Sequence, residues 1–339
     1  MPVPPRSRVT IKDVAAQAGV SVATVSKVLN QRYGVSAETF ARVTAVIKDM
    51  GYEASLVAQS LRNHRTNVIG ILVADIEPFS TELLKGAADA IRGTGFELVV
   101  YSAGGRTGDP HGWEQRYLTR LSGTLVDGAV LVTPAVDLEG LPGTPVVAVD
   151  PHTGRAALPT VDSDNLHGGR LATEHLLQLG HRRIGLLTGR EDLKSAQQRE
   201  TGYRGALASA GVAVDETLVR RGDYDADIAA ASARYLLSRP DRPTAIFAAN
   251  DTTAIAAIDA ARELGLRVPE DLSVIGFDNI PESALCTPPL STVQQPIREM
   301  GHRAVELLVR LINGAEPDQT HITLGTELVV RQSTRPLTP

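Results

Sequence analysis

The sequence predicts a small all-α head followed by two doubly wound α/β lobes with parallel sheets. Residues 10–51 carry apolar side chains at helical spacing, interrupted by capping residues and glycines. From residue 67, short apolar runs alternate with amphipathic stretches, which is the pattern of parallel strands covered by helices on both faces. This second region, of about 270 residues, is too long for one small sheet, so two lobes are expected.

Three short helices are expected in the head. Thr10 begins the first with a capping-box pattern, and Gly19 can end it in left-handed backbone. Ser21 caps the second helix, and Ser36 caps a third that stops at Gly51. The apolar faces of the three helices are Ile11, Val14, Ala15 and Ala18, then Val22, Val25, Val28 and Leu29, then Phe40, Val43, Val46 and Ile47.

Behind the head, residues 53–66 read as a short helical pattern and a polar connector, which gives a head (1–52), a hinge and linker (53–66) and a two-lobed domain (67–339). The expected strands of the large domain are Val68–Ala74, Glu97–Ala103, Gly128–Thr133, Pro145–Val149, Arg183–Thr188, Ala245–Ala249 and Leu272–Phe277. Its expected helices include Thr81–Arg92, Leu166–Leu179, Ala226–Ser238 and Thr252–Leu264.

Charge is distributed unevenly along the chain. Residues 1–65 contain nine Lys and Arg against four Asp and Glu, whereas the remainder contains 25 against 35. A basic head on an acidic body indicates that only the head approaches a polyanion. The single cysteine, Cys286, excludes an internal disulfide framework, and the N-terminal residues lack the apolar segment of a secretory signal. A cytoplasmic protein is expected.

Residues 10–30 form a helix, a glycine-containing turn and a second capped helix, the plan of a helix-turn-helix. Small residues in the first turn of the second helix allow its N-terminus to enter a major groove. Hydroxyls of Ser21, Thr24 and Ser26 can donate to phosphates, and Lys27 can reach a base or a phosphate. A helical bundle with no role in DNA binding has a similar pattern.

Three strings in the head are more specific: Asp13-Val14-Ala15, Ala18-Gly19-Val20-Ser21 and Thr24-Val25-Ser26. They resemble the head of the lactose/galactose repressor (LacI/GalR) family. The resemblance implies that Val22, Ala23 and Lys27 read bases, and that Ser21, Thr24, Ser26 and Asn30 contact phosphates. One such head covers half a site, so a homodimer on a pseudo-palindromic double-stranded operator is expected.

The segment Val57-Ala58-Gln59-Ser60-Leu61 resembles the hinge of the same family. Leu61 falls where the family inserts a leucine wedge into the minor groove, which is a recognised way to kink DNA. The other interpretation is that Leu61 packs between hinge helices. The family often has Pro-Asn before this helix, whereas this chain has Ala54-Ser55, which leaves the entry to the helix in doubt.

The resemblance continues through Leu179–Gly185, Ala249–Asp251 and Val268–Asp278, which are similar to the family's effector domain, a fold shared with periplasmic sugar-binding proteins. It implies six effector-binding residues. In open α/β sheets, ligands bind beyond the carboxyl ends of strands, and several of these residues follow predicted strands. Carboxylates, amides and a guanidinium suit sugar hydroxyls, and an aromatic ring covers an apolar sugar face. The six residues are Phe79, Asp150, Arg199, Tyr224, Asn250 and Asp278.

Other residues near the strand ends have simpler interpretations. Asp251 is expected to cap a helix rather than to bind ligand, because an Asp after a strand often does so. Trp113 either lines the cleft or covers a helix at the lobe surface. His181, followed by two arginines, is expected in a solvated turn.

The sequence lacks a phosphate loop, a G-x-S-x-G elbow, an H-E-x-x-H pair and a Cys/His metal cluster, so no catalysis, cofactor or metal is expected. The predicted function is a repressor released from its operator by a small sugar or oligosaccharide. One alternative is a regulator that needs a corepressor such as a purine. Another is a transport-type sugar-binding protein, which would need a signal sequence in place of Thr10–Leu61.

Overall fold

The structure is a computed structural model that describes residues 9–29, 33–52, 65–103, 113–121, 125–134, 144–152 and 158–337. The chain divides into two compact units. The N-terminal unit, Met1–Thr66, includes the head, and the second, Asn67–Pro339, is called the α/β unit. Within the described ranges, every helix is too short or too polar to cross a lipid bilayer. Each unit has its own hydrophobic core.

The head contains helices α1 (Ile11–Ala18), α2 (Val22–Leu29) and α3 (Ala37–Met50). The expected caps are confirmed: Thr10 and Asp13 form a reciprocal capping box, and Ser36 accepts a backbone N–H from the first turn of α3. Gly19 and Gly51 end α1 and α3 in left-handed backbone, with φ of 64° and 59°. Side chains from all three helices form the core of the head: Val14, Ala15, Ala18, Val25, Val28 and Val43.

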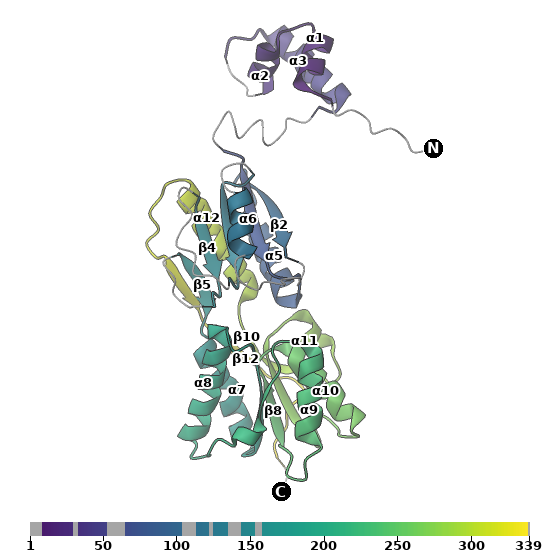
Figure 1. The fold of residues 1–339 in the computed structure, drawn as a ribbon, viewed down its shortest axis with the longest axis vertical. Coiled ribbons are helices and arrows are strands. Elements are labelled where there is room, and N and C mark those ends of the chain that lie inside the picture. Colours follow the sequence, from purple (N-terminus) through teal and green to yellow (C-terminus); the bar gives the residue numbers. More distant parts are fainter. Residues whose placement is uncertain are drawn as a thin grey trace, which may run out of the picture. The chain divides into compact units, whose positions relative to one another are not determined.

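Two six-stranded sheets form the α/β unit, and they define a first and a second lobe (Figure 1). The first sheet contains β1 (Val68–Val73), β2 (Glu97–Ser102), β3 (Gly128–Val132), β4 (Val146–Val149), β5 (Thr160–Ser163) and β11 (His321–Leu324), in the order β11-β5-β4-β3-β1-β2. The second contains β6 (Ile184–Thr188), β7 (Val219–Arg221), β8 (Ala245–Ala248), β9 (Ser273–Asp278), β10 (Ser291–Gln294) and β12 (Glu327–Val329), in the order β12-β10-β9-β8-β6-β7.

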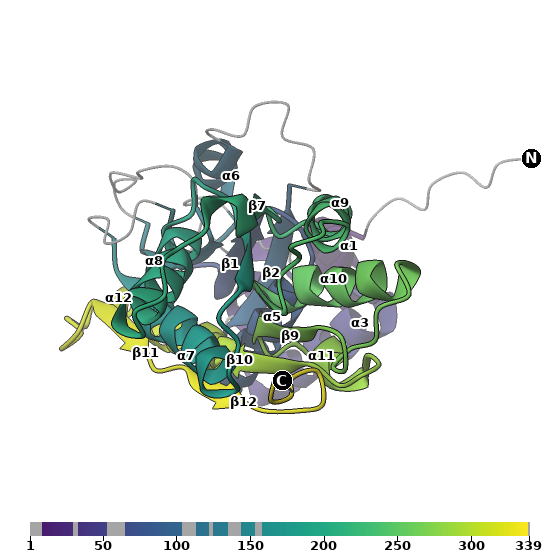
Figure 2. The same cartoon turned by 90° about the horizontal axis from the view of Figure 1, so that it is seen from below.

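Helices cover both faces of each sheet, as the apolar strands require. In the first lobe, α5 (Pro78–Ala90) and α12 (Ile297–Ile312) share one core with the strands, and α6 (Trp113–Leu121) packs on the other face. In the second lobe, α7 (Asn165–Gln178) and α8 (Lys194–Ser209) lie opposite α9 (Ala226–Leu237) and α10 (Asp251–Glu263) (Figures 1 and 2). A short helix, α11 (Pro281–Leu285), and a 3-10 turn, η1 (Glu216–Leu218), complete the second lobe.

All strand pairs are parallel among the described residues except β10 with β12. The seven strands expected from the sequence are present within one or two residues of their expected bounds. Five further strands escaped the sequence pattern, namely β5, β7, β10, β11 and β12. They are short, and polar residues interrupt their apolar character, as in the Val-Arg-Arg of β7.

The chain crosses between the lobes three times. It leaves β5 of the first lobe at residue 164 to begin α7 of the second, and it returns through residues 295–296 between β10 and α12. The third crossing, at residues 325–326, joins β11 to β12. Every change in the angle between the lobes must therefore be absorbed at these three short segments.

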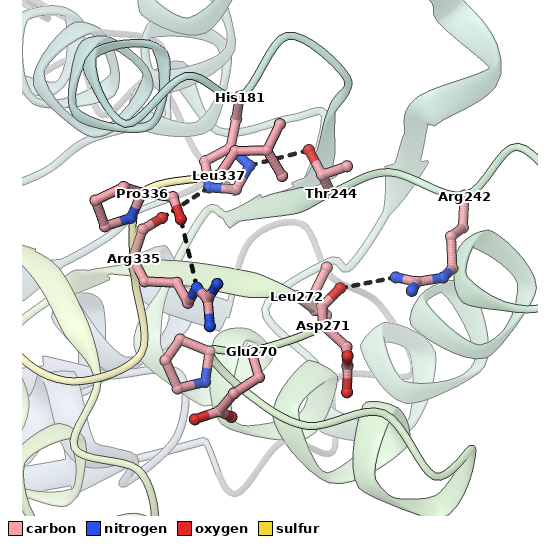
Figure 3. A pocket seen from close by; sticks show the side chains of 10 residues that line it. His181, Arg242, Thr244, Glu270, Asp271, Leu272, Arg335, Pro336 and Leu337 are labelled. Atoms are coloured by element: carbon pink, nitrogen blue, oxygen red, sulfur yellow. Dashed lines mark hydrogen bonds between the residues drawn. The ribbon is translucent and has the colours of Figure 1, made fainter. Parts of the chain in front are cut away.

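The expectation of a solvated turn at His181 is wrong. His181 is only 2% exposed. Its Nδ1 lies 2.9 Å from Thr244 Oγ1, and its Nε2 lies 3.1 Å from Ser273 Oγ and 3.2 Å from the Arg335 carbonyl oxygen. Figure 3 shows the contacts with Thr244 and Arg335. His181, Thr244 and Arg335 line a pocket of about 370 Å³ in the second lobe. Since β8, β9 and the last residues of the chain surround it, His181 is a packing residue.

Stability is expected to fall in acid through His181. Burial lowers the pKa of His181 below its ordinary value, so the folded state prefers the neutral ring. This contribution to stability is complete above the unfolded pKa and is lost as pH falls through it toward the folded pKa. The variant His181→Asn should melt a few degrees below the parent at pH 8, and the difference should shrink at pH 5.

His167 supplies the control, because its side chain is exposed on α7. In differential scanning calorimetry, His167→Asn should follow the parent at both pH values. A constant gap between parent and His181→Asn from pH 8 to pH 5 would contradict the prediction.

Candidate nucleic-acid interface and ligand site

Helix α2 turns one face to the core of the head and the other to solvent. Val25 and Val28 are buried, whereas Val22, Ala23 and Lys27 are exposed. The three side chains predicted to read bases therefore share the open face of one helix. Small side chains beside a flexible cation allow a close approach of this helix to the edges of base pairs.

The N-terminus of α2 carries the hydroxyls predicted to contact phosphates. Ser21 Oγ accepts the N–H of Thr24 at 3.1 Å and lies 3.0 Å from Thr24 Oγ1. A capped helix N-terminus with exposed hydroxyls favours an anion, because the helix dipole is positive there. Ser26 is half-buried one turn along. Asn30 and Leu61 lie outside the described residues, so their assigned contacts stay predictions.

In the second lobe, Arg199 of α8 is the centre of a buried polar cluster, and its side chain is 4% exposed. Its Nε donates to Asn165 Oδ1 at 2.8 Å, and its Nη1 donates to the Ala249 carbonyl oxygen and, at 3.3 Å, to Asp278 Oδ1. The protein thus holds one edge of the guanidinium in a fixed direction. Nη2 makes no hydrogen bond within the described part of the chain and is free to donate to a ligand.

Two aromatic rings lie against Arg199. The Arg199 Cζ atom is 3.7 Å from the ring centre of Phe277 and 5.7 Å from that of Tyr224. Both distances suit cation–π attraction, which strengthens when the pair is desolvated. Burial by itself lowers the pKa of Arg199, but Tyr224, Asp278 and Asp150 raise it above its ordinary value, so the guanidinium stays charged.

Asp278 ends β9 directly beside Arg199. Its φ is 106°, a backbone conformation that residues other than glycine rarely adopt. Oδ1 accepts from Gln295 Nε2 at 2.6 Å as well as from Arg199. Burial raises the pKa of Asp278 to about 7, and the nearby Arg199 opposes that rise. This carboxyl group therefore takes up a proton more readily than an exposed aspartate does.

Asp150 brings a carboxylate from the first lobe to the same cluster. It follows β4 with φ of 48°. Burial raises its pKa, while the charge of Arg199 and a hydrogen bond from Ser195 lower it. Since Arg199 and Ser195 belong to α8, these influences show that Asp150 faces the second lobe across the gap between the sheets. Asp162 of β5 adds a second nearby negative charge.

The loop after β4 also touches the second lobe directly. His152 Nδ1 lies 3.1 Å from Asp192 Oδ2, in the loop before α8, and the His152 side chain is 7% exposed. Arg190 forms two further hydrogen bonds to the same Asp192 carboxylate. This contact joins the two lobes next to Asp150.

Tyr224 follows β7 with φ of 61°, so it is the third of the six predicted residues with left-handed backbone. Such strain is commonly retained at functional sites. Its Oη is buried and makes no hydrogen bond within the part of the chain that the structure describes, and burial raises the pKa of the phenol to about 12. A Cβ at Gly189 would stand 2.3 Å from Tyr224 Cζ, so only glycine leaves room for the ring.

The helix cap expected at Asp251 belongs to its neighbour instead. Asn250 Oδ1 accepts the N–H of Thr253 at 2.9 Å and caps α10. Asp251 is fully buried and accepts from the Ile280 N–H at 2.9 Å and from Thr292 Oγ1. Asp251 therefore joins α10 to β10 and α11, while the amide nitrogen of Asn250 remains for a ligand.

Phe79 and Trp113 pack in apolar surroundings. Phe79, in the first turn of α5, is half-buried against the core of the first lobe. Trp113 is 5% exposed in the cluster on the opposite face of the same sheet, with its ring centre 6.0 Å from that of Tyr117. Trp113 is thus a core residue, and the ligand contact assigned to Phe79 stays a prediction.

Sequence reasoning missed three polar residues that bond to the predicted site residues and hold them in position. Ser195 lies one helical turn before Arg199, Asn165 begins α7, and Gln295 follows β10. Gln295 and Asn165 both follow strands that the sequence pattern did not predict. The expectation that ligands bind beyond the carboxyl ends of strands therefore could not point to these two residues. Only Ser195 could have been found, from its spacing to Arg199.

The cluster combines acceptors, directed donors and aromatic faces, which is the chemistry of binding a polyhydroxyl compound. Among the described residues, no group of three or more His, Cys, Asp or Glu is arranged to hold a metal ion. The Ser195 hydroxyl is bonded to the Asp150 carboxyl group. The arrangement suits binding rather than covalent catalysis.

Two family models match the chain. Residues 10–55 match bacterial regulatory proteins of the lacI family, and residues 173–334 match the periplasmic binding protein-like domain. The first match covers α1 to α3, and the second covers most of the lobe that contains Arg199 and Asp278.

Full-length relatives agree with both matches. The chain is 33% identical to the HTH-type transcriptional repressor PurR of Photobacterium profundum over 335 residues, which is 97% of this chain and 99% of that protein. It is similar to a solved complex of the transcriptional regulator CelR with cellobiose, with 37% identity, TM-score 0.72 and coverage of 96% and 100%. It is also similar to the Lac repressor dimer bound to operator and an anti-inducer, with 30% identity, TM-score 0.84 and coverage of 97% and 100%.

Proposed function

The chain belongs to the lacI family of bacterial regulatory proteins, and we propose that it is a repressor that a small neutral carbohydrate releases from its operator. The family makes it a helix-turn-helix transcription regulator with a sugar-binding type of effector domain. The observation that carries the sugar assignment is the fixed guanidinium of Arg199 between two aromatic rings and the Asp278 carboxylate.

The balance of charge supports a neutral ligand. The charge of Asp162 raises the pKa of Asp150, and the charge of Asp150 raises the pKa of Asp278, while Arg199 is already paired with Asp278. A phosphorylated sugar would add negative charge to this site. Hydroxyl groups, in contrast, donate to carboxylates and accept from the remaining Arg199 and Asn250 nitrogens.

A two-part experiment tests the proposal. First, sequences bound by the full-length protein are selected from a random duplex pool, which should yield a pseudo-palindromic operator. Second, operator affinity is measured by fluorescence anisotropy with cellobiose, ribose, glucose 6-phosphate or guanine present. A neutral sugar should weaken operator binding about 5–150-fold. Lack of response to every neutral sugar would contradict the carbohydrate assignment.

A second candidate function is regulation by a corepressor, a ligand that the protein needs in order to bind its operator. A relative named as PurR is 33% identical over nearly the whole chain. If the ligand is a corepressor, the parent binds its operator only when that ligand is present. The same titration separates the two, because a corepressor tightens operator binding where an inducer weakens it.

For the head, we expect a steep dependence of operator affinity on salt and a separate role for Lys27. Each phosphate neutralised by a cation adds about −0.9 to the slope of log affinity against log salt. If Lys27 reads bases, Lys27→Ala should lose about 1–3 kcal/mol of discrimination per half-site and leave the slope nearly unchanged.

Lys48, exposed in the last turn of α3, is the matched control. Lys48→Ala should alter neither the sequence preference nor the slope. Loss of one slope unit or more in Lys27→Ala, without relaxed preference, would make Lys27 a phosphate contact instead.

A further inference from the structure

Five buried residues form a closed ring of hydrogen bonds between the lobes, through their side chains and the Ser163 carbonyl group. Ser163 Oγ donates to Gln295 Oε1 at 2.7 Å, and Gln295 Nε2 donates to Asp278 Oδ1 at 2.6 Å. Arg199 Nη1 donates to the same Asp278 oxygen at 3.3 Å, and Arg199 Nε donates to Asn165 Oδ1 at 2.8 Å. Asn165 Nδ2 closes the ring at 3.1 Å on the Ser163 carbonyl oxygen.

The members of this ring are placed where the lobes join. Ser163 ends β5 and Asn165 begins α7, so they flank the first crossing of the chain. Gln295 directly follows β10 and lies in the second crossing. Arg199 and Asp278 are the two central residues of the proposed effector site. The ring thus joins two crossings to the ligand cluster without an intervening residue.

The third crossing is attached to the first. The Asp164 N–H donates to the Leu324 carbonyl oxygen at 2.8 Å, and Thr326 Oγ1 donates to the Asp164 carbonyl oxygen at 3.2 Å. Asp164 lies between Ser163 and Asn165 in the chain. All three crossings are therefore connected through Asp164 and its two neighbours in the chain, Ser163 and Asn165.

Burial makes the ring an all-or-none element. Each of its five residues is at most 6% exposed. A buried donor or acceptor that loses its partner cannot turn to water. Opening the bond between Ser163 and Gln295, or the bond between Asn165 and Arg199, therefore leaves buried polar atoms without that partner. A ligand that draws Asp278 or Arg199 toward itself must therefore shift Gln295 and Asn165 as well.

We propose that this ring transmits effector binding to the angle between the lobes, with Ser163, Asn165 and Gln295 as positioning residues. The inference rests on the proposed function, because it assigns regulation to the same ligand cluster. A ligand changes the lobe angle only through contacts that differ between two arrangements. Arg199 and Asp278 supply such contacts, and Gln295 carries them to both crossings.

The first test uses the full-length protein without ligand. Native-state hydrogen exchange is measured at the amides of Asp164 and Gly168, which are bonded to the Leu324 and Asp164 carbonyl oxygens. Gln295→Ala should speed exchange at both amides about tenfold or more, although the substitution lies in another crossing.

Gln294→Ala is the matched control for this exchange measurement. The adjacent Gln294 is bonded to Asn279 at 2.9 Å and stands outside the ring. Gln294→Ala should leave the rates of both amides within about twofold of the parent. Unchanged exchange in Gln295→Ala, or equal change in the two variants, would overturn the proposal.

The second test separates coupling from binding, with cellobiose and ribose as probes. For the sugar that releases the parent, Gln295→Ala should keep its operator affinity and its sugar affinity within about threefold, while the release falls below about threefold. Loss of sugar affinity together with release would make Gln295 a ligand contact and overturn the positioning role. If neither sugar releases the parent, the proposed function has failed, and the exchange experiment still decides whether the ring joins the crossings.

Discussion

Replacing Arg199 with alanine is expected to leave operator affinity intact and to abolish the response to the releasing sugar. The side chain is held by Asn165, Ala249 and Asp278, and all of these contacts lie in the α/β unit rather than the head. Alanine removes the fixed donor that sugar hydroxyls would meet. The sugar-dependent change in operator affinity, expected to be about 5–150-fold in the parent, should fall to within about twofold.

The substitution Arg199→Ala is also expected to lower the free energy of unfolding. Removal of the arginine leaves the Asp278 carboxyl buried without its cation, and breaking such a pair typically costs about 3–5 kcal/mol unless the acid takes up a proton. Because burial already raises the pKa of Asp278 to about 7, protonation should relieve part of that cost. Melting of Arg199→Ala at pH 6 and pH 8 should show a larger loss at pH 8.

Arg199→Lys provides the control for charge alone. Lysine keeps a cation beside Asp278. It lacks the planar guanidinium group, which donates to Asn165 and to Asp278 at the same time. It should recover stability relative to alanine without restoring the sugar response. An alanine variant that responds to the same sugar concentration as the parent would show that the cluster is not the effector site.

A second large effect is expected from Gly202→Ala in α8. A Cβ at this position would stand 2.4 Å from the Leu166 carbonyl oxygen and 2.6 Å from the Arg170 amide nitrogen. Both atoms belong to the backbone of α7, so a rotamer change cannot relieve the overlap. We expect a loss of about 3 kcal/mol or more, seen as a drop of about 6–12 °C in Tm.

Gly205 lies on the same helix, one turn later, and is the matched control. A Cβ there meets nothing within 4 Å, and the residue is exposed. Gly205→Ala should therefore stabilise the protein by about 1 kcal/mol through helix propensity. If the two alanine variants melt alike, then α7 and α8 are not as closely packed as the structure indicates.

The same helix contact positions the ligand cluster. A Cβ on Gly169 of α7 would stand 2.2 Å from the Arg199 carbonyl oxygen, so the backbone of Arg199 rests directly on α7. Asn165, one turn earlier on α7, accepts from the Arg199 side chain. Close packing of glycines thus fixes the direction of the guanidinium, which links stability to the proposed effector site.

Local signals in the sequence predicted the head correctly. Capping and left-handed termination depend on a few consecutive residues, so Thr10, Ser36, Gly19 and Gly51 act in the structure as their chemistry predicts. The seven main strands were equally visible, because strands covered on both faces are apolar throughout. Edge and crossover strands such as β7 and β11 carry no such signal, since they are short and partly polar.

The sequence by itself determined the fold class, the recognition helix and, through family resemblance, several members of the ligand cluster. Only the tertiary structure decided which partners each side chain meets. Asn250 rather than Asp251 caps α10, and His181 is buried rather than solvated. Gln295 bonds both to Asp278 and to Ser163, which lies 132 residues before Gln295 in the chain. Such contacts depend on how strands and helices far apart in sequence pack, and no spacing within one segment records that arrangement.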